Sequence, residues 1–377
     1  MFGGDQFSIA ERECFLYEQC IEWKKEGREL YIYGAGAAGE MFFSALLLHG
    51  IIVQGFCVDS VYFKQGMACC GLSVFHIGEL LKQSGNDRKI GIITAFMDRE
   101  KRQPGSSESV KFVEVDPLAL ETSGYRFDYK FVEEHIPQLD DVYSHLADGK
   151  SRQCMKAYFN QRISGRMEYL ETLSDGNKYY DRQIVSLKNI TCMIDCGAFD
   201  GDSFLSFCAN YKQETGKEYR DVAVLMEPDP ENYAALEKIC ADRDYVKTMN
   251  IGVWGHKGIL KFEGGSSTGS RIAENGSISV EVDSIDHVVS ELAEEGKIKN
   301  REMFIDMDIE GSEWNALKGA EATIKTYHPV LAVCIYHKRD DFLTLPQYIR
   351  SMYGGYRLYL RAYERYSHDV VLYAVSD

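Results

Sequence analysis

The sequence contains fewer basic than acidic residues, no CxxC motif and no long apolar run. Of its 377 residues, 42 are Lys or Arg and 58 are Asp or Glu, so the formal net charge is −16. Such an acidic chain repels phosphate backbones, and nucleic acid is therefore not expected as a general partner. The longest apolar stretch, around residues 45–48, is far too short to cross a bilayer, so we expect no membrane insertion.

The cysteine pattern does not indicate a metal centre. There are 11 cysteines, but none forms a CxxC pair and no ligand spacing is repeated, so the sequence assigns no metal site. Cys69 and Cys70 are adjacent, whereas Cys57, Cys192 and Cys334 lie in apolar runs, where a reduced thiol behaves as a small hydrophobic side chain. We therefore expect a reduced, cytoplasmic protein. The first residues have no basic segment before an apolar run, so we expect no signal peptide.

The residues that are present are typical of a globular protein built from strands and helices. Hydrophobic residues make up 45% and charged residues 27%. Strands that alternate with helices predict an α/β fold with mainly parallel sheets. We expect a small Rossmann-like domain at 1–122, a helical connector at 123–185 and a second α/β domain at 186–377, which ends in an antiparallel edge hairpin. The aromatic connector would be compatible with a homodimer.

A glycine-rich turn follows the first predicted strand, Leu30–Tyr33. Gly34, Gly36 and Gly39 lead into a helix, and the second strand ends at Asp59. This context is typical of a nucleotide site, in which the helix N-terminus binds phosphate and the acidic residue binds a ribose. The glycines would equally permit a tight strand–helix crossing, and Asp59 could cap a turn. If a ligand binds here, a sugar nucleotide or a dinucleotide is expected.

The rest of the first domain is predicted to contain short elements and a long loop. We expect short strands at 74–76 and 90–95 with a helix at 77–83 between them. Residues 100–117 are polar and contain Gly, Ser and Pro, so they are predicted to form a surface loop.

A second glycine loop, CMIDCGAFDGD at 192–202, is the main candidate for a cofactor site. A short buried strand stops at a carboxylate, a glycine loop follows, and a helix begins. Such a loop lets the backbone approach a nucleotide closely. The candidate residues of this loop are Asp195, Gly197, Ala198, Gly201 and Asp202.

Further candidates follow the later strands of the same domain. Ligands of parallel α/β sheets bind outside the carboxyl ends of the strands. The residues at those ends are Glu227, Pro228, Asn250, Gly252, Asp308, Glu310 and His337. A carboxylate at the end of the second strand, Glu227, suits a ribose because it accepts hydrogen bonds from two hydroxyl groups, although it could also cap a helix.

Strand alternation predicts that Asp306, Asp308 and Glu310 share one face of a buried strand. Three acids there are costly unless they are paired, solvated or bound to metal. We favour a salt-bridge network or a contact with a cofactor amine over a hard cation.

His337 follows a strongly apolar strand and is expected at the same edge. It could act as a general base near neutral pH. The other reading is a simple pair with Asp340 or Asp341.

Several motifs together resemble one known family. They are IDCGAFDGDS (194–203), MEPDPENYAAL (226–236), FIDMDIEGSEWNALKGA (304–320), IYHKRDDF (335–342) and LYLRAYERYSHDVVLYA (358–374). Over about 178–377 the chain is similar to the FkbM family of S-adenosylmethionine-dependent methyltransferases. The segments 146–165 and 178–181 (KYYD) resemble the helical lead-in of family members that carry an N-terminal domain, and YIYGAGAAGE (31–40) resembles the Rossmann-like N-terminal domain of sugar acyltransferases.

The resemblance implies a class I methyltransferase fold, S-adenosylmethionine as cofactor, and O-methylation of a sugar, polysaccharide or glycosylated small molecule. It places the cofactor's methionine part at Asp195, Gly197 and Gly201, its ribose at Glu227, its adenine near Asn250 and Gly252, and its methyl group beside Asp308 and Glu310. The transfer itself requires alignment of the hydroxyl with the methyl group and a base for the hydroxyl proton. Asp308 or His337 is the expected base.

The sequence departs from the family pattern at three places. Phe199 replaces the middle glycine of the loop, Asp306 stands where Lys is common, and Ala362 stands where His is common. Two alternatives therefore stay open: a sugar-nucleotide oxidoreductase that uses a dinucleotide at the first glycine loop, and a binding protein that has kept the fold without the activity.

Overall fold

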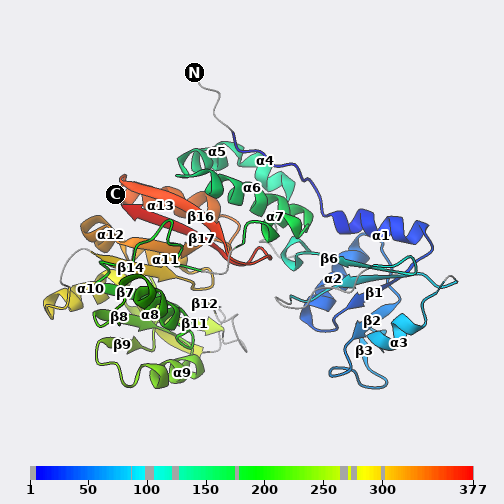
Figure 1. Cartoon of the computed structure of the whole chain (residues 1–377), viewed down its shortest axis with the longest axis horizontal. Helices are drawn as coiled ribbons and strands as arrows, with labels where there is room; N and C mark the ends of the chain where they lie inside the picture. Colours follow the sequence, from blue (N-terminus) through cyan, green and yellow to red (C-terminus); the bar gives the residue numbers. More distant parts are fainter. Residues whose placement is uncertain are drawn as a thin grey trace. The chain divides into compact units, whose positions relative to one another are not determined.

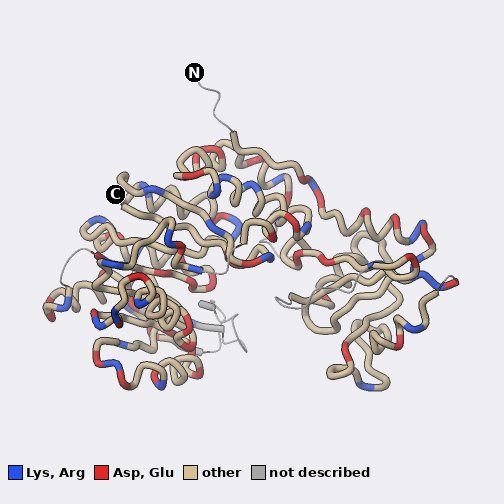
Figure 2. The backbone as a smooth tube through the Cα atoms, viewed as in Figure 1, with Lys and Arg blue, Asp and Glu red and all other residues tan. Residues whose placement is uncertain are grey.

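The computed structural model describes residues 6–85, 87–97, 106–120, 127–174, 178–263, 271–272, 278–298 and 302–376. The chain divides into two compact units. The first, the N-terminal unit, comprises 1–140, 153–174 and 362–369, and the second, the C-terminal unit, comprises 141–152, 175–361 and 370–377. The consecutive domain boundaries expected from the sequence stay a prediction. Acidic residues are distributed over both units, as Figure 2 shows.

The N-terminal unit is built on a six-stranded sheet with the order β3-β4-β2-β1-β5-β6 (Figure 1). All neighbours from β4 to β6 are parallel, and only β3 runs antiparallel to β4. Ile32, Phe56 and Ile93, from three of these strands, are fully buried. The bounds are β1 Glu29–Tyr33, β2 Gly55–Val58, β3 Ala68–Cys69, β4 Leu72–His76, β5 Ile90–Thr94 and β6 Val110–Glu114.

The expected surface loop at 100–117 was partly wrong. Residues Val110–Glu114 form β6, which pairs in parallel with β5. Val110 and Val113 are buried while Lys111 is half-exposed, so this edge strand covers the core on one side only. Sequence reasoning missed this strand because the residues beside it are polar and resemble a loop. Residues 98–105 lie outside the described residues.

Helices pack against strands of this sheet, and further helices follow along the chain. Phe127, Tyr158 and Phe159, from the predicted helical connector, pack edge to face in one aromatic cluster. The bounds are α1 Phe15–Lys25, α2 Ala37–Leu48, α3 Ile77–Lys82, the 3-10 helix Pro117–Leu120, α4 Tyr129–Glu134, α5 Ile136–His145, α6 Gly149–Ser164 and α7 Glu168–Glu171. None of the helices in the described ranges is both long and apolar enough to span a membrane.

The C-terminal unit contains a seven-stranded sheet with the order β16-β17-β15-β14-β7-β8-β9. The pairs from β15 to β9 are parallel, and β17 runs antiparallel to β15, which confirms the mainly parallel sheet with an antiparallel edge. All residues of the central strands β7 and β14 are buried, as expected for strands covered on both faces. The bounds are β7 Cys192–Cys196, β8 Val222–Met226, β9 Val246–Met249, β14 Met303–Met307, β15 Val330–Cys334, β16 Tyr356–Ala362 and β17 Val370–Ser376.

A small sheet with the order β10-β13-β11-β12 accompanies this main sheet. Its strands are β10 Gly252–Val253, β11 Gly258–Glu263, β12 Arg271–Ile272 and β13 Ile278–Asp283. The helices of the unit are α8 Asp202–Thr215, α9 Pro230–Cys240, α10 Ile285–Glu294, α11 Glu313–Lys318, α12 Glu321–Tyr327 and α13 Asp341–Met352. Asp229 caps α9 and Pro230 occupies its first turn, as the sequence predicts.

Candidate active site

The loop after β7 is shaped by glycines that lie close to a neighbouring strand end. Gly197 has φ +89°, and a Cβ atom at this position would lie 2.2 Å from the backbone oxygen of Asp308. The amides of Gly197 and Ala198 both donate to the carbonyl of Met226, at 3.0 Å each. Gly197 therefore lets the ends of β7, β8 and β14 lie close together. A residue with a side chain at this position would displace the backbone.

Glu227, directly after β8, is held by the same loop. Its Oε2 accepts the amide of Phe199 at 2.9 Å, and its Oε1 accepts the amide of Asp229 at 2.8 Å. Phe199 adopts φ +47°, so the glycine-like conformation is kept although the glycine is missing. Glu227 is buried, and burial raises the pKa of its carboxyl. The carboxylate keeps free lone pairs for further donors beyond these two amides.

The residues predicted to lie near the adenine, and those at the end of the glycine loop, interact mainly with neighbouring backbone. Asn250 follows β9, and its Nδ2 donates to the carbonyls of Glu227 at 2.8 Å and Pro228 at 3.2 Å. Gly252 lies in β10, paired with β13. Gly201 is the N-cap of α8, and Asp202 is that helix's first residue.

Asp195 and Asp306 are direct neighbours on the paired strands β7 and β14. Both are 2% exposed. Ser203 Oγ donates to Asp195 Oδ2 at 2.5 Å. Asp306 Oδ1 is buried without a hydrogen-bond partner among the described residues. Burial raises the pKa of Asp195 to about 7 and that of Asp306 well above its usual range, with each carboxyl adding to the shift. Because two adjacent buried carboxylates repel each other, at least one is protonated at neutral pH.

The expected single face of three acids was wrong. β14 ends at Met307, and Glu310 adopts φ +52°, so the alternation of a strand does not reach Asp308 and Glu310. Asp306 faces Asp195 inside the sheet, whereas the two later acids lie beyond the strand end. The chain turns here because the backbone of Asp308 must pass Gly197.

Asp308 contacts four residues of two other segments. Lys178 Nζ and Tyr179 Oη lie 3.0 Å from its Oδ2, and Tyr336 Oη lies 3.2 Å from its Oδ1. His337 Nε2 lies 3.3 Å from the same Oδ1. Burial alone would raise the pKa of Asp308, but Lys178 and His337 lower it well below the usual range. Asp308 is therefore a stable carboxylate and a weak proton acceptor.

His337 does not have the environment of a neutral base, and this expectation was wrong. Its Nδ1 lies 2.9 Å from Glu313 Oε1, and its Nε2 lies near Asp308 and 3.6 Å from Glu310 Oε2. Burial would lower the pKa of the imidazole, but these carboxylates raise it to about 10. The alternative partners, Asp340 and Asp341, are not the ones that form these ion pairs. At neutral pH His337 is a cation that anchors the acids.

Glu310 differs from its neighbours because it is both accessible and easily protonated. Its side chain is 37% exposed. Burial of the carboxyl, together with Asp308 and Glu313, outweighs the attraction of His337 and raises the pKa of Glu310 to about 7. A carboxylate of this kind can accept a proton near neutral pH.

The comparisons with known proteins agree with this arrangement. Residues 195–364 match the family model described as the methyltransferase FkbM domain. This segment is therefore similar to the methyltransferase FkbM domain, and we refer to it below as the FkbM domain. The chain is also similar to the crystal structure of methyltransferase FkbM from Methylobacillus flagellatus KT, with a TM-score of 0.68 and 21% identity over 95% of this chain and 93% of that one. No curated protein matches the sequence.

Two other solved structures are similar to the chain over about half of its length. Methanococcus jannaschii fibrillarin, a pre-rRNA processing protein, gives a TM-score of 0.31 and 11% identity over 51% of this chain and 69% of that one. Aeropyrum pernix fibrillarin, solved with bound S-adenosyl-L-methionine, gives 0.27 and 10% over 51% and 69%. The strand order of the seven-stranded sheet and the M. flagellatus structure together establish the class I methyltransferase fold.

Sequence reasoning missed four residues of the polar cluster around Asp308 and His337. Three contact Asp308, and the fourth is the fully buried Glu313, whose Oε1 also accepts the amides of Ile309 and Gly311. The others are Lys178, Tyr179 and Tyr336. Their signal was present in the KYYD, EGSE and IYH motifs, but no spacing in the sequence relates these segments to one another.

The glycine loop outside the FkbM domain is largely explained by its own packing. Gly34 has φ +117°, and a Cβ atom at Gly39 would lie 2.1 Å from the carbonyl oxygen of Gly34. Both glycines are therefore needed for the crossing from β1 to α2. Gly36 has open space around it, and the backbone carbonyl of Asp59 accepts the amide of Tyr62 in a turn. A second nucleotide site here stays a prediction.

Proposed function

We propose that the protein uses S-adenosylmethionine to methylate a hydroxyl group on a sugar, a polysaccharide or a glycosylated small molecule. The observation that carries the proposal is the position of Glu227. Two backbone amides fix this buried carboxylate beside the glycine loop, at the strand ends of a class I methyltransferase sheet. The acceptor class is supported by the family resemblance.

The residues present suit this cofactor. Glu227 would hold the ribose hydroxyls with the lone pairs that Phe199 and Asp229 leave free. The loop from Asp195 to Gly201 would hold the methionine part, and its excess of carboxylates favours a positively charged ligand.

S-adenosylmethionine, when bound, supplies an electrophilic methyl group on a sulfonium. The protein's own task is then to orient the acceptor hydroxyl and to remove its proton. Glu310 would accept that proton, because its carboxyl is exposed and its pKa is raised to about 7. Asp308, held as a carboxylate by Lys178 and His337, would accept a hydrogen bond and position the acceptor.

Cofactor binding can be tested by calorimetric titration of the full chain with S-adenosylmethionine, S-adenosylhomocysteine, NAD and a UDP-sugar. We expect both sulfur compounds to bind and Glu227→Ala to weaken them about 10- to 100-fold, the loss of one charge-assisted hydrogen-bonding group. Glu237→Ala, at an exposed position on α9, is the matched control. Tight binding of NAD with no binding of either sulfur compound would favour the oxidoreductase alternative.

Acceptor chemistry requires a second assay. Formation of S-adenosylhomocysteine should depend on an added sugar nucleotide or polysaccharide fragment, and the product should carry an O-methyl group by mass spectrometry. Binding of the cofactor without turnover on any hydroxyl acceptor would instead support a binding protein that kept the fold.

A further inference from the structure

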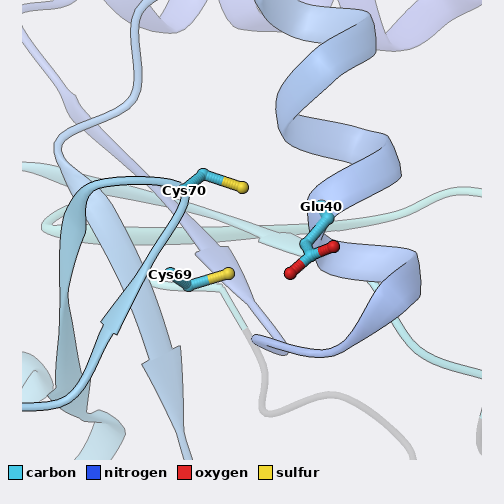
Figure 3. A group of neighbouring side chains, drawn as sticks. All are labelled: Glu40, Cys69 and Cys70. Atoms are coloured by element: carbon cyan, nitrogen blue, oxygen red, sulfur yellow. The ribbon is translucent and has the colours of Figure 1, made fainter.

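We infer that Glu40, Cys69 and Cys70 form a binding site for a thiophilic divalent cation, with Zn²⁺ as the best match. One ligand atom from each residue lies within 4.8 Å of the other two. Figure 3 shows both sulfur atoms directed toward the start of α2, where Glu40 is located. The cluster belongs to the N-terminal unit and lies outside the FkbM domain.

A short hairpin brings the two cysteines to this position. β3 and β4 pair antiparallel with Cys69 opposite Leu72, so only Cys70 and Gly71 form the turn. Both turn residues are left-handed, with φ +49° and +78°. Such two-residue turns strongly favour Asn-Gly, and a cysteine in the first place is unusual. Cys70 thus occupies a conformation that its side chain does not favour, at the place where its thiol meets Glu40.

The donor set selects the kind of ion. Two thiolates and one carboxylate suit Zn²⁺, which binds sulfur at about 2.3 Å and oxygen at about 2.0–2.2 Å in a tetrahedron. Ligand atoms of such a site are separated by roughly 3.5–3.8 Å. The separations of at most 4.8 Å can shorten by rotation of the Glu40 and Cys70 side chains, because both residues are exposed. Water would fill the fourth position. Mg²⁺ and Ca²⁺ prefer oxygen ligands and do not fit.

The neighbouring helix end favours the same anionic set. α2 begins after Gly36, which has no side chain to cap the first turn. The first turn of a helix favours anionic ligands. Burial and Cys70 raise the pKa of the Cys69 thiol to about 11, so this thiol would release its proton when the ion binds. A bound ion would clamp the β3–β4 hairpin to the first turn of α2, beside the loop that contains Gly34 and Gly36. We therefore assign it a structural role in ordering that loop.

The test uses the full chain, reduced and treated with a chelator. Titration with Zn²⁺ alone should give one equivalent bound with micromolar or tighter affinity, and Co²⁺ should give a thiolate-to-metal charge-transfer band. Cys70→Asn removes one ligand but suits the left-handed turn, so the variant should fold and lose the band. Glu40→Gln should weaken binding about tenfold or more. Cys208→Ser, at a half-buried cysteine of α8, should leave both readouts unchanged.

The outcomes separate clearly. Failure of the reduced wild-type chain to bind Zn²⁺ overturns the site, as does unchanged stoichiometry and charge-transfer absorption in Cys70→Asn. Unchanged affinity in Glu40→Gln overturns the three-ligand assignment. A rise in the melting temperature on addition of Zn²⁺, seen in the wild-type chain and in Cys208→Ser but absent in Cys70→Asn, supports the clamp.

Discussion

At the scale of single residues, three acids within a five-residue segment have three different chemistries. Asp306 is buried against Asp195, and its pKa is raised far above the usual range. Asp308 contacts Lys178 and is a firm carboxylate. Glu310, partly exposed, has its pKa raised to about 7. Burial and the sign of the nearest charge decide these differences, so one acid can remain neutral, one can position a ligand and one can accept a proton.

Replacing Glu310 with Gln tests the assignment of the base. Turnover should fall by roughly 10²–10⁴-fold, the usual contribution of a positioned general base, while the affinity for S-adenosylmethionine changes little. The wild-type rate should rise with pH through about 7 as Glu310 loses its proton, and this dependence should vanish in the variant. Glu321→Gln, at an exposed position on α12, serves as the control. A variant that keeps the wild-type pH profile would exclude Glu310 as the base.

Gly197→Ala should destabilise the C-terminal unit more than a left-handed glycine usually does. Left-handed strain alone costs roughly 1–3 kcal/mol. Here the new Cβ would also lie 2.2 Å from the backbone oxygen of Asp308, so a strand end must move. Gly216→Ala is the matched control, because Gly216 has φ +74° but open space around the added Cβ. Equal losses in urea unfolding for the two variants would show that the close approach to Asp308 is unimportant.

At the scale of elements, one buried arginine joins the edge strand β16 to two loops of the same unit. Arg361 is 2% exposed, and its Nη2 lies 2.7 Å from Asp148 Oδ2 while its Nε lies 3.0 Å from Asp181 Oδ2. Burial would raise the pKa of Asp148, but Arg361 and Ser151 lower it to about 2. Asp181 ends the KYYD segment that carries Lys178, so this network also holds the residues that contact Asp308.

Arg361→Met should lower the free energy of unfolding by about 3–5 kcal/mol, because it leaves the buried carboxylate of Asp181 and the half-buried one of Asp148 without their partner. Arg357→Met, on the same strand but exposed, should cost far less. Denaturant unfolding of both variants at pH 7 provides the measurement. A loss in Arg361→Met no larger than in the control would mean that water replaces the guanidinium without cost.

At the scale of the whole molecule, the chain is strongly acidic, and a buried cation stabilises one cluster of its carboxylates. The formal net charge is −16. Within the described C-terminal unit, His337 alone lies within 4 Å of three carboxylates, those of Asp308, Glu310 and Glu313. The charge state of this histidine therefore links the stability of the unit to pH.

The sign of that linkage follows from the raised pKa of His337. Its ordinary value of 6.5 becomes about 10 in the folded chain, so its contribution is complete below about 6.5 and is lost as pH rises through about 10. Between pH 7 and pH 10, the wild-type chain should lose more stability than His337→Gln by at least about 1 kcal/mol, the equivalent of one pKa unit. His256→Gln, at an exposed position, should follow the wild type in urea titrations at both pH values. A parallel loss in His337→Gln would contradict the ion-pair assignment.

The sequence by itself determined the features that depend on neighbours along the chain. Alternating strands and helices predicted the α/β fold and its antiparallel edge. Motifs such as IDCGAFDGD and MEPDP carried the resemblance to the FkbM family, whereas the cofactor roles of this loop and of Glu227 stay predictions. Asp229 and Pro230 marked the start of α9 because caps act within one turn. Strand ends also placed the candidate acids at one edge, since parallel strands share a carboxyl end.

Only the tertiary structure decided which of these groups meet, and with what charge. Strand register places Asp195 beside Asp306, although 110 positions separate them. The folded chain also brings Lys178 beside Asp308 and Glu313 beside His337. The carboxylates around His337 make it a cation, although the sequence predicted a neutral base. The physical reason is that a pKa depends on burial and on charges in space, and a sequence specifies neither until the strands are paired.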